Sequence, residues 1–180
     1  MQKGLDLAGA GASARTHGGA HSIVGGPWTT GRAVLLGTLA VFVLDGIDAL
    51  VFSALRGVSP MRLFQAIAFS LLGRDTYTYG LPSALLGVLL HFSVALGIVS
   101  VYILVSRWLR PLREYPFLFG PLYGIAAWLV MNFVVLPLTL IGHPRLAWPS
   151  VVNGILIHMF GVGLPAAFAA SRIKSTRIVT

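Results

Sequence analysis

The sequence contains no cysteine and very little charge. Of its 180 residues, only 10% are Asp, Glu, Lys or Arg, against about 25% in a typical soluble domain. Without cysteine, the chain forms no disulfide and no thiolate metal site. Low charge together with 56% hydrophobic residues excludes an ordinary soluble domain and indicates a membrane protein.

Four apolar segments are long enough to cross a bilayer, a distance that takes about 20 helical residues. None of them contains lysine or arginine. We therefore predict an all-α membrane protein with four transmembrane helices, which together form a transmembrane domain over 32–172. The predicted spans are 33–55, 82–106, 117–142 and 149–171.

A shorter helix is predicted after the first span, at 60–72. Ser59 is a good N-cap residue for it, and Gly73 suits the position after its end. Because this helix is too short to span a bilayer, we expect it to lie in the interface or to re-enter the membrane. In an interfacial position, Arg62 and Gln65 would face the lipid headgroups.

The net charge of +8 is not a nucleic-acid signal, because the basic residues cluster at the ends of the spans. With the N-terminus inside, only four of the thirteen Lys and Arg residues fall in outer loops, which favours two cytoplasmic termini. We expect a multi-pass protein of a bacterial inner membrane, with the lipid bilayer as partner and no nucleic acid. We predict that residues 1–31 form a disordered cytoplasmic tail without a signal peptide. We predict that residues 173–180 form a basic cytoplasmic tail.

An internal repeat links the second and fourth spans. Residues 82–91 and 149–158 both read P-S-x3-G-x-L-x-H, so they predict a duplicated two-helix unit with His91 and His158 at the same depth. Four glycines predict helix-packing positions, because small residues let helices approach closely in lipid. They are the G-x-x-x-G pair of the third span and the glycine one turn before each histidine: Gly120, Gly124, Gly87 and Gly154.

Several polar side chains lie within the predicted spans. An aspartate at mid-membrane costs about 2.5–3.5 kcal/mol on insertion scales, so each one indicates a functional site. No fixed cation lies within a span. Each carboxylate must therefore be protonated, paired with histidine, bound to a cation or hydrated. Counting depth along the helices, we expect the polar groups to converge on one interior layer: Asp45, Asp48, His91, Asn132, Asn153 and His158.

Several short motifs along the chain together form a recognisable pattern. They are the Ser59-Pro60 pair, His91, the G-x-x-x-G start of the third span, Leu136-Pro137-Leu138, the Trp148-Pro149 turn, and Gly154 with His158. This pattern resembles the YagU-like group of small bacterial inner-membrane proteins. The resemblance covers roughly 40–165 and implies a four-span topology, without implying a particular activity.

The polar layer leads to three hypotheses about function. The first is a proton- or cation-linked channel or transporter, for which four spans would favour a homo-oligomer. The second is a non-catalytic structural, accessory or lipid-interacting protein. The third is an intramembrane metal or haem protein that uses His91 and His158, with Asp45 and Asp48 as further metal ligands. We expect no enzyme and no required cofactor, because the sequence lacks a nucleophile elbow, a phosphate loop and an HExxH motif.

Overall fold

The computed structural model describes residues 28–144 and 147–173. The predicted tails therefore lie almost entirely outside the described residues. At the edge of the first tail, Thr29 is already the N-cap of the first helix, which begins at Thr30 rather than at 33. Every regular element in the described part of the chain is helical, and the only strand-like feature is an isolated bridge between Trp28 and Ile173.

Four helices are long and apolar enough to cross a membrane, which confirms the predicted four-span all-α fold. The first two are α1 (Thr30–Ala54) and α3 (Leu81–Val105). The third comprises α5 (Pro116–Val130), η2 (Met131–Val135) and η3 (Leu136–Leu138), and the fourth comprises α6 (Trp148–Ile157), η4 (His158–Gly163) and α7 (Leu164–Ser171). Shorter elements connect them: α2 (Pro60–Leu72), η1 (Gly73–Tyr77) and α4 (Pro111–Glu114).

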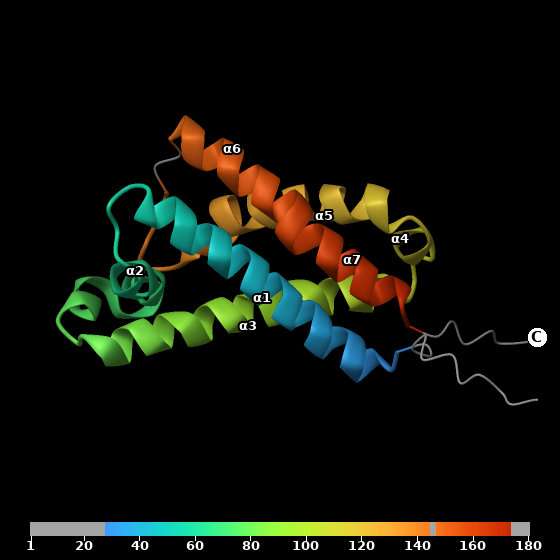
Figure 1. Cartoon of the computed structure of the whole chain (residues 1–180), viewed down its shortest axis with the longest axis horizontal. Coiled ribbons are helices and arrows are strands. Elements are labelled where there is room, and N and C mark those ends of the chain that lie inside the picture. Colours follow the sequence, from blue (N-terminus) through green and yellow to red (C-terminus); the bar gives the residue numbers. More distant parts are fainter. Residues whose placement is uncertain (1–27, 145–146, 174–180) are drawn as a thin grey trace, which may run out of the picture.

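The spans form an up-and-down bundle in which both ends of the described chain lie together (Figure 1). The Trp28 backbone N–H donates to the Arg172 carbonyl at 2.8 Å. We call this the terminal end of the bundle, and the opposite end, where α2 lies, the α2 end. Helix α1 packs between α3 and the fourth span, and α5 packs on the other side of the fourth span. The Tyr123 hydroxyl of α5 reaches across to α3 and donates to the Ile98 carbonyl at 2.7 Å.

Small residues let the third and fourth spans touch backbone to backbone. A Cβ added at Gly120 would lie 2.9 Å from Leu164 Cα, and one at Gly124 would lie 2.8 Å from Met159 Cα. Gly163 faces this pair from the fourth span, directly against the backbone of α5. The core at the terminal end is therefore narrow and dry, built mainly from alanine and β-branched residues.

The third and fourth spans are interrupted in the same way. Each contains a π-helical segment, η2 or η4, that ends two residues before a proline, Pro137 or Pro165. A proline has no backbone N–H to donate to the preceding turn, and its ring would clash with a carbonyl of that turn. A wider, π-helical turn before the proline relieves this clash. The third span consequently ends at Leu138, followed by extended Thr139, and not at 142 as its apolar composition predicts. The first and second spans are uninterrupted, and the structure does not confirm the duplicated two-helix unit.

Helix α2 lies across the direction of the spans, and Figure 1 shows it nearly end-on. Ser59 caps it by accepting from the Arg62 N–H at 3.4 Å, and Gly73 ends it with a φ of +61°. Its backbone at Phe64 lies directly against Gly87 of α3, where a Cβ would collide with it. Gly87 therefore admits the short helix rather than another span.

A buried polar network fastens α2 to the start of α3. The Gln65 side-chain amide donates to the Gly80 carbonyl at 3.0 Å and to Ser83 Oγ at 3.2 Å. Thr76 Oγ1 donates to the Gln65 carbonyl at 3.3 Å, and Ser83 Oγ donates to the Thr76 carbonyl at 2.6 Å. The expectation that Gln65 faces the headgroups is therefore wrong, because only 2% of this residue is exposed. Arg62 does lie at the surface, over the ring of Tyr77.

Candidate functional site

Asp45 and His91 face each other between α1 and α3. His91 Nε2 lies 3.7 Å from Asp45 Oδ2, and the two side chains are 13% and 22% exposed, respectively. This distance is longer than a direct hydrogen bond, and His91 Nε2 is buried without a hydrogen-bond partner among the described residues. Gly46 lies beside the imidazole, and a Cβ there would make ordinary van der Waals contact with His91 Nε2 at 3.5 Å.

His158 approaches the same carboxylate from the fourth span. It is the first residue of η4, and its Nδ1 lies 2.9 Å from the Gly154 carbonyl. Because a carbonyl only accepts, Nδ1 carries the proton and the neutral ring keeps Nε2 free to accept another. Both histidines lie within electrostatic reach of Asp45. All three side chains are about 14–15 Å from the α2 end of their spans, at 1.5 Å per residue.

Asp48 and Asn153 form a separate pair, closer to the α2 end. Asn153 Nδ2 donates to Asp48 Oδ2 at 2.8 Å and joins the first span to the fourth. Both residues are half-buried. This bond gives one oxygen of the Asp48 carboxylate a fixed donor, which Asp45 does not have among the described residues.

Asn132 belongs to neither group. Its side-chain amide donates to the Trp128 carbonyl of its own helix at 2.9 Å, and no bond in the described part of the chain joins it to Asp48. The Trp128 indole, in turn, lies over Gly154, where a Cβ would be 3.1 Å from the ring carbon Cδ1. The single polar layer expected from the sequence is therefore divided: a trio formed by Asp45 and the two histidines, a pair formed by Asp48 and Asn153, and Asn132 apart from both.

The trio lines a partly open cavity of about 360 Å³. Asp45, His91 and His158 form part of its wall, and aliphatic side chains form most of the rest. Helix α2 covers the cavity with Leu63, Ala66, Ile67 and Ser70. The cover is tied down at its far end, since the Leu140 N–H donates to the Ser70 carbonyl at 3.1 Å. Asp48, Asn153 and Asn132 are not among the lining residues.

The structure adds one polar residue that composition does not reveal. Thr38 is fully buried in α1, and its hydroxyl has no hydrogen-bond partner among the described residues. It lies seven residues before Asp45, which places it two turns nearer the terminal end on the same helix face. A lone threonine in an apolar helix gives no signal by itself; only its spacing from Asp45 could have indicated a role.

No protein-family model, curated protein or solved structure matches this chain. The geometry of the cluster itself therefore has to support any assignment of function. In the stretches 28–144 and 147–173, no three His, Asp or Glu side chains are grouped as a metal ion would require. The proposed ligand set of His91, His158, Asp45 and Asp48 is thus not assembled around one point.

Proposed function

We propose that this polytopic membrane protein is a proton-linked transporter-like or gated channel-like protein whose proton-exchanging site is Asp45, His91 and His158. One observation carries the proposal: a carboxylate and two imidazoles from three different spans line the same cavity. Ionisable side chains at this depth typically mark ion pathways and proton relays.

The chemistry of the site follows from the lack of lysine and arginine within the spans, because no fixed positive charge neutralises the carboxylate. A proton that enters the cavity has three acceptors of different type within one small volume, and histidine is the side chain suited to gain and lose it near neutral pH. When His91 is protonated, its attraction to ionised Asp45 at about 4 Å amounts to about 4 kcal/mol at an effective dielectric constant of about 20. That attraction favours a direct hydrogen bond over the present separation of 3.7 Å. Protonation of His91 would therefore draw the two side chains together.

The packing favours a gated pathway over an open pore. Toward the terminal end the cavity wall includes Val41, Ala95 and Val162, which belong to the buried core that continues to that end, and Ile98, which packs against this core. Beyond them, Thr38 is the next polar group along α1. Exchange with the terminal end then requires movement of this packing, and the π-helical segment that begins at His158 is a natural place for it.

Proton flux into liposomes tests this proposal. Asp45→Asn keeps the size of the side chain and removes its titration, and we expect at least a tenfold loss of flux driven by a pH gradient. Asp75→Asn is the matched control, because Asp75 is exposed and lies outside the cavity, and it should retain full flux. Equal flux in the wild type and in Asp45→Asn would overturn the proposal.

A structural role is the second candidate, and it is favoured specifically for Asp48 and Asn153. Their 2.8 Å bond joins two spans and lies outside the cavity wall. Such a bond fixes the register of two helices without any need to exchange protons. If no variant of the trio changed flux while every variant lowered stability, the whole cluster would belong to this structural class and an accessory protein would be the better description.

The proposal also includes the oligomeric state of the protein and its resemblance to a known family. The described cavity lies within one chain, so a homo-oligomer would supply several parallel sites rather than complete one. The resemblance to the YagU-like group remains a prediction, and it implies only the four-span topology.

A further inference from the structure

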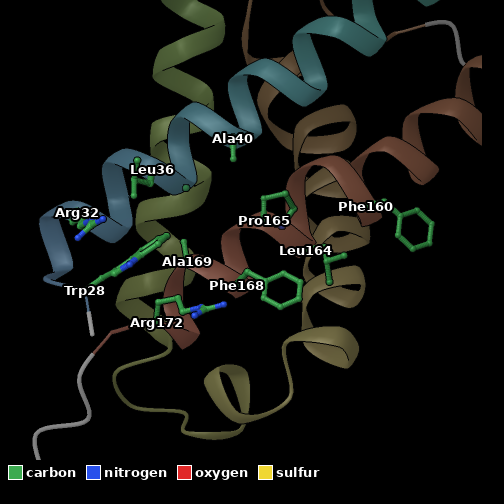
Figure 2. A pocket seen from close by; sticks show the side chains of 11 residues that line it. Trp28, Arg32, Leu36, Ala40, Phe160, Leu164, Pro165, Phe168, Ala169 and Arg172 are labelled. Carbon is green, nitrogen blue, oxygen red and sulfur yellow. The ribbon is translucent and has the colours of Figure 1, made fainter. Parts of the chain in front are cut away.

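A second, larger hollow lies between α1 and the fourth span at the terminal end of the bundle. Its volume is about 700 Å³. Figure 2 shows two arginines and a tryptophan together at one end of this groove and an aromatic ring at the other. We call it the α1–α7 groove, and its lining residues are Trp28, Arg32, Leu36, Gly37, Ala40, Phe160, Leu164, Pro165, Phe168, Ala169 and Arg172.

Most of the groove is apolar, and its length matches about one leaflet of a lipid bilayer. Its floor is at Gly37, where a Cβ would lie 2.9 Å from Ala169 Cβ, so the two helices leave a shallow channel between their larger side chains. Along the fourth span the groove reaches from Arg172 to Phe160. That separation is about 18 Å at 1.5 Å per residue, close to half of the roughly 30 Å hydrocarbon thickness.

The charged end of the groove is formed by Arg32, Arg172 and Trp28. The Arg32 guanidinium carbon lies 5.4 Å from the centre of the Trp28 ring. The Trp28 backbone N–H donates to the Arg172 carbonyl, and Figure 2 shows the Arg172 side chain at the same end of the groove. Within the described part of the chain, neither arginine pairs with a carboxylate. Two cationic groups therefore stand at the mouth of an apolar groove without a counter-ion among the described residues.

We infer that the α1–α7 groove binds one anionic phospholipid, with its phosphate at Arg32 and Arg172 and an acyl chain along the groove toward Phe160. Arginine suits this role because its planar guanidinium donates to phosphate in a bidentate manner. A tryptophan at the headgroup level completes the usual pattern of a membrane interface. The terminal end is the predicted cytoplasmic side, and anionic lipids are concentrated in that leaflet. This inference does not depend on the proposed proton site.

Native mass spectrometry of the full chain in detergent tests the inference with defined lipids. Phosphatidylglycerol is the anionic probe, and phosphatidylcholine with the same acyl chains is the zwitterionic comparison. We expect one tightly held phosphatidylglycerol and weaker phosphatidylcholine. Each arginine near a headgroup contributes about fivefold to affinity, so Arg32→Gln/Arg172→Gln should bind phosphatidylglycerol about 30-fold more weakly.

Two controls make the result decisive. Arg110→Gln/Arg113→Gln removes the same charge at the same end of the bundle but outside the groove, and it should bind like the wild type. Inorganic phosphate, added as a competitor at millimolar concentration, should not displace the lipid, because the acyl chain supplies much of the affinity. Equal loss in both double variants, no preference for phosphatidylglycerol, or displacement by phosphate alone would each overturn the inference.

A variant that fills the groove provides an independent check. Ala40 is half-buried and lines the groove, so Ala40→Phe should obstruct the acyl chain and weaken phosphatidylglycerol with both arginines intact. Ala126→Phe is the matched control, at an exposed position of α5 outside the groove. Equal lipid retention in the two variants would contradict an acyl chain in this groove.

Discussion

The backbone contact between the third and fourth spans makes a sharp prediction for Gly124→Ala. The new Cβ would lie 2.8 Å from Met159 Cα and closer still to the His158 carbonyl, whereas ordinary contact begins at 3.4 Å. The two spans would have to separate by at least about 0.6 Å at this point, and neither neighbour is a flexible side chain. Such overpacking costs about 1–3 kcal/mol, while alanine gains back up to about 1 kcal/mol of helix propensity.

The matched control for this change lies in α3. Gly97 has nothing within 4 Å of its added Cβ, so Gly97→Ala carries the propensity gain alone and should be neutral or stabilising. We expect Gly124→Ala to be about 2 kcal/mol less stable than Gly97→Ala. For a chain of this size that difference corresponds to about 4–8 °C in thermal unfolding, measured for the purified protein in a mild detergent. Equal melting temperatures for the two variants would refute the close backbone packing at the start of η4.

Three further changes test other contacts. Gly87→Ala should displace α2 from α3 and increase protease cleavage of the 55–80 segment, with Gly97→Ala cleaved like the wild type. Gln65→Leu should destabilise the same end by about 1–3 kcal/mol, because it leaves buried carbonyl groups unpaired; unchanged thermal stability would contradict the network. A double-mutant cycle of Asp48→Ala with Asn153→Ala should show a coupling energy of about 1–2 kcal/mol. A cycle in which Asn132→Ala replaces the second change should be additive within about 0.5 kcal/mol.

The sequence predicted the architecture well, because length and apolar composition determine which segments can span a bilayer. The four spans and the short helix after the first one all appear in the structure. The third span ends earlier than composition predicts, because Pro137 removes an N–H donor just where an apolar stretch continues. The π-helical segments were not predicted, since hydrophobicity does not report the width of a helical turn.

The candidate site was only partly predictable, because depth can be counted along a helix but rotation cannot. Asp45, His91 and His158 were expected at one depth, and the structure places them around one cavity. Asn132 was expected at about the depth of Asp48, yet its side-chain amide bonds to the backbone of its own helix. The burial of Gln65 was missed because the sequence does not show that Gly87 admits α2 so closely that a side chain of the short helix becomes interior.

Proton flux measured side by side for Asp45→Asn and Asp48→Asn is the most direct test of the divided cluster. Asp45 lines the cavity with two histidines, whereas Asp48 lies outside the cavity wall and accepts a hydrogen bond from Asn153. We therefore predict that liposomes carrying Asp45→Asn lose flux at least tenfold, while those carrying Asp48→Asn retain flux in proportion to the amount of folded protein. Full flux in Asp45→Asn, or a loss confined to Asp48→Asn, would show that protons do not pass through the cavity shared by Asp45, His91 and His158.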